Sequence, residues 1–336
     1  MPAILSSPLL RQLALVLCWS AGFVGYRYAA DHAPTLLVTC WRLLLAALLL
    51  LPFAWAEVRR LPLKIIGQQA GIGVLAFAGA VGPAAKAIEL GVSPGLAALL
   101  SDLSPLLVAL GCCLLPGQRT NGRQWLGLGL GLTGVLLATG AGLGLGVAPA
   151  WAYALPLGSA LALALATLVQ SRLPPSRLAL RTQLFIQLAA SSLVMLGVAG
   201  VEGPLTPPLT LGFALAVLWL LIPTLLGFGL YWLCLRQGSP QAVSGALYLS
   251  PPVALLWAWA CFDEPLAPGM LLGLLFALAG LLCLNAAERT RQPEPALGGS
   301  LSEEGAMPTA VSTGEGLAWR GRRAVRPCRR PARRGP

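Results

Sequence analysis

The chain has 336 residues, of which 57% are hydrophobic and 10% charged, and its formal net charge is +11. A soluble domain carries about a quarter charged residues, so a water-soluble fold could not hide this much apolar surface. A chain embedded in lipid must satisfy its own backbone hydrogen bonds, which leaves α-helices or a closed barrel. The apolar runs are about 20 residues long, as helical spans require, whereas barrel strands would have about 10 residues of alternating polarity. We therefore predict an all-α membrane protein.

Ten apolar segments follow one another along the chain, joined by short connections rich in Pro, Gly and Arg. The N-terminal residues Met1 to Arg11, followed by the apolar stretch Leu13–Val24, could suggest a signal peptide, but no small-residue cleavage site follows and further spans do. We therefore expect an uncleaved first helix, and the first span is predicted at 9–27. The remaining spans are predicted at 35–55, 65–86, 94–115, 124–143, 151–171, 181–201, 210–235, 241–262 and 268–286.

Basic residues are distributed unevenly between alternate connections. With a cytoplasmic N-terminus, the inside segments hold ten basic residues before the C-terminal tail, and the outside segments hold two, Arg27 and Lys86. Cytoplasmic loops of membrane proteins carry the excess of Lys and Arg. The bias therefore predicts an even number of spans, with both termini cytoplasmic, in the cytoplasmic (inner) membrane.

Residues 289–336 differ from the rest of the chain. They contain ten arginines, several prolines and glycines, and no apolar span. This composition cannot bury a core, which predicts a disordered cytoplasmic tail. The basic stretch 320–334 would be attracted to anionic lipid; a tail with no specific role is the alternative. Since it lacks interleaved aromatic residues, we expect no nucleic-acid binding.

The two halves of the chain resemble each other at an offset of 146 residues. Leu103-Ser104-Pro105 matches Leu249-Ser250-Pro251, and a further Ser-Pro pair lies eleven residues earlier in both halves. Each half, 1–143 and 151–286, holds five predicted spans, so the second half enters the membrane from the opposite side. Inverted repeats are typical of secondary transporters, whose substrate binds between the repeats. The pattern predicts a carrier of ten transmembrane helices, built as two inverted five-helix repeats.

Several motifs also carry a resemblance to a known family. They are Gly95–Leu100, Leu103–Leu106, Gln124–Gly127, Gly131 and Gly134 in the first half, Ser250-Pro251, Asp263-Glu264-Pro265 and Gly280 in the second, with Trp19, Phe23 and Arg42 before them. Over residues 10–286 the chain resembles the EamA-like branch of the drug/metabolite transporter (DMT) superfamily. The resemblance implies ten helices, cytoplasmic termini and proton-linked or gradient-linked export of metabolites, amino acids or drugs. Where that family often has Gly-Glu-Arg, this chain has Gly117-Gln118-Arg119, so only Glu264 remains of the two loop carboxylates.

Two ionisable residues lie deep in the predicted spans, where charge is costly and usually functional. Arg42 is about seven residues into the second span and Asp102 about eight into the fourth, both counted from outside, which at about 1.5 Å per residue gives similar depths of roughly 10–12 Å. An Arg42–Asp102 ion pair is therefore geometrically feasible. Two interpretations stay open: a static pair that fixes packing, or a site where Asp102 binds a proton or a cationic group of the solute.

The repeat extends this candidate site. Asp102 matches Tyr248 at an offset of 146, and Arg42 matches Gln183 at an offset of 141. Gln187 lies one turn beyond Gln183 on the same helix face. Polar side chains that face lipid would be costly. We therefore expect all five side chains to line one inward cavity.

Aromatic, proline and glycine residues complete the predicted carrier. The cavity walls are predicted to include the aromatic residues Trp19, Phe23, Tyr231 and Trp232. Pro105 and Pro251 each remove a helix hydrogen bond, so we expect bends there that shape the cavity, act as hinges or only serve packing. Glycines in the fifth and tenth spans favour close helix approach, either within the chain or in a homodimer.

Other classes of membrane protein fit the sequence less well. Serine proteolysis would need a histidine base near the nucleophile, yet the single histidine, His32, lies in the first loop. No Walker A sequence is present, so the chain is not itself an ATP-driven pump. Seven of the eight cysteines lie in apolar runs and none forms a CxxC pair, so we expect no metal and no cofactor. The alternatives to a transporter of a small solute are a membrane-embedded enzyme and a non-transporting scaffold or sensor.

Overall fold

The computed structural model describes residues 7–92, 94–114, 120–139, 148–173, 178–262 and 268–289. Within these ranges the chain forms helical segments joined by turns, with no strand, which confirms the predicted all-α class. The predicted tail, 289–336, lies outside the described residues except for Arg289. The residues Arg119 and Glu264, from the two loops compared above, also lie outside them.

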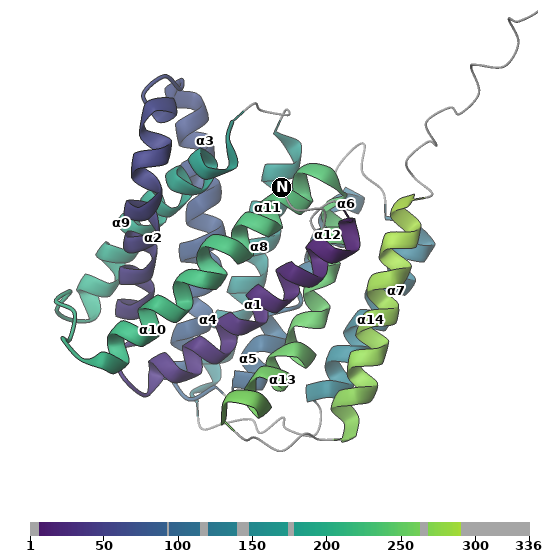
Figure 1. Cartoon of the computed structure of the whole chain (residues 1–336). Helices are drawn as coiled ribbons and strands as arrows, with labels where there is room; N and C mark the ends of the chain where they lie inside the picture. The colour runs from purple at the N-terminus through teal and green to yellow at the C-terminus, as the bar shows by residue number, and fades with distance from the viewer. Residues whose placement is uncertain are drawn as a thin grey trace, which may run out of the picture. The chain divides into compact units, whose positions relative to one another are not determined.

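The first half begins with two continuous helices, and two interrupted spans follow (Figure 1). Its elements are α1 (Pro8–Ala30), α2 (Thr35–Val58), α3 (Leu63–Gly73) with the π-helical η2 (Val74–Gly79) and α4 (Ala80–Glu89), α5 (Pro94–Ser101) with α6 (Ser104–Leu114), and α7 (Gly122–Thr139).

The second half repeats this pattern of continuous and interrupted spans. Its elements are the 3-10 turn η4 (Ala150–Tyr153) with α8 (Ala154–Arg172), α9 (Leu180–Glu202), α10 (Leu211–Ile222) with the π-helical η5 (Pro223–Gly227) and α11 (Phe228–Gln237), α12 (Pro240–Ala246) with the 3-10 turn η6 (Leu247–Leu249) and α13 (Ser250–Phe262), and α14 (Pro268–Arg289).

Eight helical segments among the described residues are long and apolar enough to cross a membrane. A shorter apolar helix, Leu271–Ala287, lies within α14. The chain is therefore a multi-pass helical membrane protein, while the count of ten spans stays a prediction.

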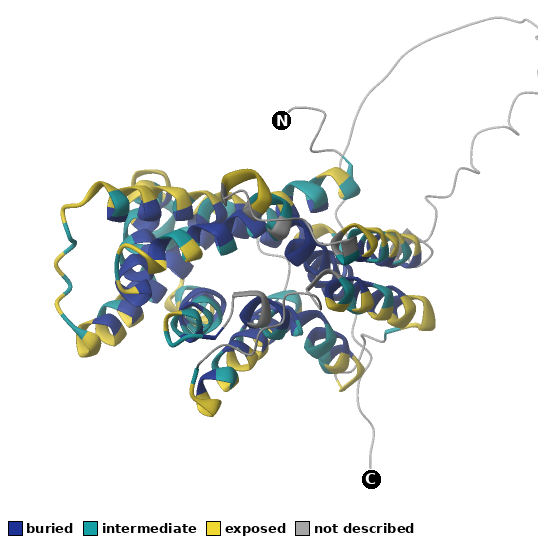
Figure 2. Cartoon of the chain, turned by 90° about the horizontal axis from the view of Figure 1, so that it is seen from below, coloured by how far each residue is buried: buried dark blue, intermediate teal, exposed yellow. Residues whose placement is uncertain are grey.

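The surface of the bundle is apolar and part of its interior is polar. Large apolar side chains such as Phe53, Leu193 and Leu275 are 63%, 70% and 63% exposed. Polar side chains such as Thr39 and Ser191 are fully buried. Figure 2 shows that the buried stretches of the helices face the interior of the bundle and the exposed ones face outward. This distribution suits a protein whose surroundings are lipid tails, because exposed apolar patches of this extent are rare on soluble monomers.

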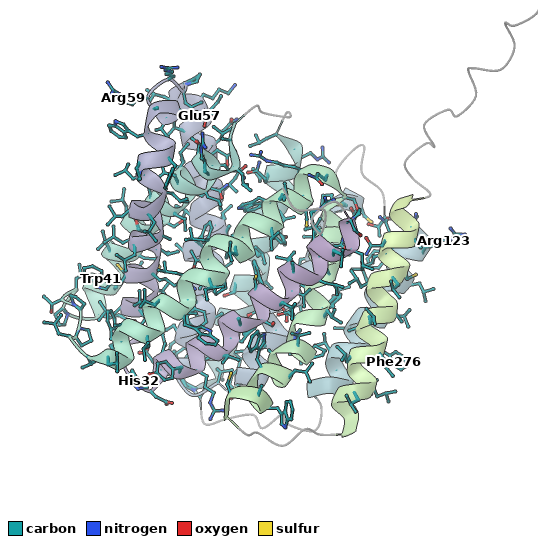
Figure 3. The ribbon with its side chains drawn as sticks, viewed as in Figure 1. His32, Trp41, Glu57, Arg59, Arg123 and Phe276 are labelled. Atoms are coloured by element: carbon teal, nitrogen blue, oxygen red, sulfur yellow. The ribbon has the colours of Figure 1, made fainter. Side chains whose placement is uncertain are left out.

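The second helices of the two halves run in opposite directions. The N–H group of Ala179, just before α9, donates to Glu57 Oε1 near the end of α2, at 3.1 Å. Past the other end of α9, the carbonyl oxygen of Leu205 accepts a 3.0 Å hydrogen bond from Trp41 Nε1, near the start of α2. We name the two ends of the bundle the His32 end and the Arg59 end, after residues that lie at opposite ends of α2 (Figure 3).

Helices α7 and α14 lie side by side and approach backbone to backbone (Figure 1). A Cβ atom at Gly134 would lie 2.6 Å from the carbonyl oxygen of Gly273, and one at Gly280 would lie 2.6 Å from that of Gly127. No side chain fits at such distances. The glycines predicted to allow close packing therefore join these two helices within the chain.

The fourth span of each half is interrupted at the equivalent place. Asp102 and Leu103 form a turn between α5 and α6, and η6 separates α12 from α13. Pro105 and Pro251 are each the second residue of the half-helix that follows. A proline there has no N–H to donate and clashes with the preceding turn, which accounts for the interruption.

Candidate functional site

A cavity of about 100 Å³ lies between helices of both halves. It is bounded by α1, α2, α4, α5 and the Asp102 turn from the first half, and by α8, η5 and α11 from the second. Most of the lining is apolar; the polar side chains that line it are Tyr26, Arg42, Ser101, Asp102 and Ser159. A mostly apolar pocket with a few convergent polar groups is the usual form of a small-molecule site.

Aromatic rings form one wall of the cavity. Trp19 and Phe23, one helical turn apart on α1, line it together with Phe228 of α11. The ring centroids of Trp19 and Phe228 are 4.7 Å apart, and those of Phe77 and Phe228 are 4.0 Å apart. Aromatic pairs at such separations contribute stability beyond that of their buried area. The contacts between these rings therefore stabilise this wall of the cavity.

Arg42 brings a buried positive charge to the cavity. Its side chain is only 3% exposed, its guanidinium carbon lies 5.0 Å from the centroid of the Tyr26 ring, and its Nε has no hydrogen-bond partner. A guanidinium over an aromatic face is stabilised by the quadrupole of the ring. The Tyr26 ring therefore offsets part of the cost of burying this charge while leaving a donor unused.

Asp102 brings a carboxyl group to the same cavity from the turn between α5 and α6. Its side chain is 4% exposed, and its Oδ2 has no hydrogen-bond partner. Although Arg42 and Asp102 both line the cavity, no ion pair joins these two described residues. The pair that their similar depths made feasible is therefore not formed in this structure.

Several buried polar atoms without a hydrogen-bond partner belong to residues that line this cavity, although others lie elsewhere in the described chain. Those at the cavity are Arg42 Nε, Asp102 Oδ2 and the hydroxyl oxygens of Ser101 and Ser159, whereas the Tyr26 hydroxyl lies near Thr39. A buried polar group that lacks a hydrogen bond costs about 1–3 kcal/mol. Such groups in native proteins are usually satisfied by water or by a ligand. Four of them around one space indicate a site for a polar solute.

Two glutamines that were predicted to line the cavity lie elsewhere. Gln183 accepts a 2.5 Å hydrogen bond from Arg236 and donates to Gln170 at 3.2 Å. Gln187 donates to Gln69 Oε1 at 2.8 Å. These bonds link α9 to α11, α8 and α3. Within the described chain, neither glutamine is a lining residue of the cavity.

The two tyrosines predicted for the site lie behind its walls. The Tyr231 hydroxyl forms a 2.6 Å hydrogen bond with Thr167 Oγ1. The centroid of the Tyr231 ring lies 5.6 Å from that of Trp19 and 5.2 Å from that of Trp232. Tyr248 packs in an apolar cluster with Leu99, and it lies close enough to Asp102 to interact with it electrostatically. Of the predicted residues, Trp19, Phe23, Arg42 and Asp102 line the cavity, whereas Gln183, Gln187, Tyr231, Trp232 and Tyr248 do not.

Three polar residues of the site were missed by the sequence reasoning. Tyr26 follows Phe23 by three residues, so it continues the α1 stripe, and this spacing could have identified it. Ser101 directly precedes Asp102 in the interrupted span. Ser159 stands among Leu, Ala and Gly residues of α8 with no sequence signal that distinguishes it.

Comparison with known proteins identifies the family. The family model of the EamA-like transporter family matches twice, over residues 7–140 and 150–286. The chain belongs to the EamA-like transporter family. The two matches coincide with the two structural halves, so each half is one EamA repeat. None of the curated proteins matches the chain.

A solved structure supports the fold of this EamA-like chain. It is described only as a crystal structure of a protein, shares 20% sequence identity and aligns with a TM-score of 0.70. The alignment covers 85% of this chain and 99% of the other. At this identity the likeness shows the fold alone.

Proposed function

We propose that this chain is a secondary transporter that moves a small solute by alternating access through the cavity between its two repeats. The observation that carries the proposal is the cavity with Arg42 and Asp102 on its walls, both with unused hydrogen-bonding atoms. Transporters bind substrate between inverted repeats, where interrupted helices expose polar groups. Asp102 lies in such an interruption, and α2 and α9 run in opposite directions.

The chemistry of the cavity favours a zwitterionic solute such as an amino acid. Arg42 can donate two parallel hydrogen bonds to a carboxylate. Asp102 can accept from an ammonium group or take up a proton, which would couple transport to a proton gradient. The aromatic wall of Trp19, Phe23 and Phe228 would pack against an apolar side chain of the solute.

The membrane arrangement is part of the same proposal. The chain lies in the inner membrane and crosses it ten times, so that both termini are cytoplasmic. The His32 end of the bundle then faces outward. The excess of basic residues in the connections at the Arg59 end supports this orientation. Export is the direction that the family resemblance favours.

The test compares cells that express the intact chain, the Asp102→Asn variant or an empty vector. Untargeted mass spectrometry of the culture medium should find one class of solute enriched only with the intact chain. The purified protein in proteoliposomes should then exchange labelled for unlabelled solute. If the identified solute is not exchanged by the purified protein, the chain is a scaffold or sensor and the proposal is wrong.

A further inference from the structure

Polar side chains tie the end of α4 to two other helices at the His32 end. Lys86 Nζ lies 2.9 Å from Glu202 Oε1, at the last residue of α9, and 2.7 Å from Glu89 Oε1 of its own helix. Glu89 Oε2 in turn accepts hydrogen bonds from the N–H group (3.0 Å) and the hydroxyl (2.7 Å) of Thr35, the first residue of α2. We name Lys86, Glu89, Thr35 and Glu202 the Lys86 cluster.

A second cluster ties the end of α11 to its neighbours at the Arg59 end. Arg236 Nη2 donates to Gln183 Oε1, in the first turn of α9, at 2.5 Å and to the carbonyl oxygen of Leu178, just before α9, at 3.0 Å. Glu57, near the end of α2, accepts a hydrogen bond from the hydroxyl of Thr182. The charges of Arg236 and Glu57 are close enough to interact. We name Arg236, Gln183, Glu57 and Thr182 the Arg236 cluster.

The two clusters are built from equivalent parts of the two repeats. Each takes a basic residue from the half-helix that follows a π-helical segment: Lys86 from α4 after η2, and Arg236 from α11 after η5. Each takes a threonine from the first turn of the second helix of one repeat, Thr35 or Thr182. Each takes a glutamate from the end of the second helix of the other repeat. The clusters lie at opposite ends of the α2–α9 pair.

The half-helices that bear the basic residues also line the cavity. α4 contributes Ala80, Ala84 and Ile88 among others, while η5 and α11 contribute Pro223 and Phe228. π-Helical segments are uncommon and often mark functional sites in helices. A rotation of α4 about η2, or of α11 about η5, would therefore widen the cavity toward one end.

We propose that the Lys86 cluster and the Arg236 cluster are opposing latches, which close the cavity at the His32 end and at the Arg59 end and open in alternation. This inference rests on the proposed transport function, because a carrier must never open both ends together. Lys86, Glu89 and Glu202 have side chains that are 24%, 31% and 34% exposed, and such ion pairs are weak enough to break in each cycle. Removing one latch shifts the population toward the state that is open at that end.

Residue-specific thiol labelling tests the latches without a known substrate. The full-length chain carries Ala84→Cys on the cavity side of α4, and a membrane-impermeant thiol reagent is added at the His32 end of protein in sealed vesicles of known orientation. The modification of residue 84 is followed by mass spectrometry. We expect Glu202→Gln to raise the labelling rate about two- to fivefold, and Arg236→Gln to lower it by a similar factor. With the reagent at the Arg59 end, Arg236→Gln should raise the labelling rate and Glu202→Gln should lower it.

Two controls separate a latch from a general change of charge. Asp31→Asn removes an exposed carboxylate at the same end but outside the cluster, and it should leave the rate unchanged. Lys86→Glu should raise the rate, and adding Glu202→Lys should return it toward that of the parent. Shifts in the same direction for Glu202→Gln and Arg236→Gln, or no shift in either, would overturn the latches. Opposite shifts in a protein that exchanges no solute would support the latches and contradict the transport function instead.

Discussion

Asp102 and Tyr248 occupy equivalent positions 146 residues apart, and each lies where the fourth span of its repeat is interrupted. Their surroundings nevertheless differ. Asp102 lines the cavity, whereas Tyr248 packs with Leu99 and Leu128, and its ring fills the space beside Gly131. The two repeats therefore share the interruption of the backbone but not the chemistry at that point. Solute binding at these equivalent positions is expected from the first repeat alone.

This asymmetry predicts opposite results for two conservative substitutions. Asp102→Asn replaces the carboxyl group that faces the cavity, and we expect at least about a tenfold loss of solute exchange, since a hydrogen bond to a charged group of the solute contributes about 1.5–3 kcal/mol. Tyr248→Phe removes a buried hydroxyl that does not line the cavity, so exchange should be unchanged, and the stability should fall by no more than one hydrogen bond contributes, about 0.5–1.5 kcal/mol. Counterflow in proteoliposomes and thermal unfolding in detergent measure the two effects. Equal losses in both variants would contradict the assignment of the site.

Arg42 predicts a second pair of outcomes, because its guanidinium both faces the cavity and lies over the Tyr26 ring. Arg42→Lys keeps the charge but loses the planar, bidentate geometry. We expect the KM for exchange to rise about tenfold, equivalent to about 1.4 kcal/mol. Arg42→Ala should abolish exchange while the protein still inserts in the membrane. Normal exchange by Arg42→Lys would show that the guanidinium serves packing rather than binding.

Much of the fold could be predicted because lipid leaves few choices. Every span had to form a helix to satisfy its backbone, and the segment lengths followed from membrane thickness. The matching Ser-Pro pairs indicated the repeat, since proline restricts a helix wherever it occurs. The π-helical segment η2 could not be predicted, because Val74–Gly79 has no residue that forbids an ordinary helix, whereas η5 begins at Pro223. Both segments contact helices far away in the sequence: η2 contacts α8 and α9, and η5 contacts α1.

The site could be predicted only in part, for a similar reason. Arg42 and Asp102 stand out because charge is rare inside a span. Sequence symmetry then assigned Gln183 to the same cavity, but symmetry relates backbone positions and does not determine hydrogen-bond partners. Gln183 meets Arg236, whose side chain comes from the end of another span. A polar residue in a span faces inward, yet it can be satisfied by a neighbouring helix instead of a solute.

The glycine contacts between α7 and α14 predict a position-dependent effect on stability. Gly280→Ala places a Cβ 2.6 Å from the carbonyl oxygen of Gly127 and 2.7 Å from the nitrogen of Gly131, so the helices must separate. Overpacking of this kind costs about 1–3 kcal/mol. Gly129→Ala is the matched control, because its Cβ would meet nothing within 4 Å, and alanine favours a helix by up to about 1 kcal/mol. Thermal unfolding should show a lower midpoint for Gly280→Ala only; equal midpoints would mean that the two helices are not in close contact.

The hydrogen bond between Gln187 and Gln69 distinguishes polar residues that serve packing from those that serve the solute. Both side chains are buried, and Gln187 Nε2 donates to Gln69 Oε1 at 2.8 Å. Gln187→Met leaves the Gln69 oxygen without its donor, at a cost of about 1–3 kcal/mol, whereas replacing both glutamines with Met removes the need for the bond. We expect the single variant to unfold at a lower temperature and the double variant to recover most of the loss. Exchange per folded molecule should be unchanged in both, because neither side chain lines the cavity. A double variant that is stable yet loses exchange tenfold would instead place these glutamines in the solute path, as their positions in the sequence first indicated.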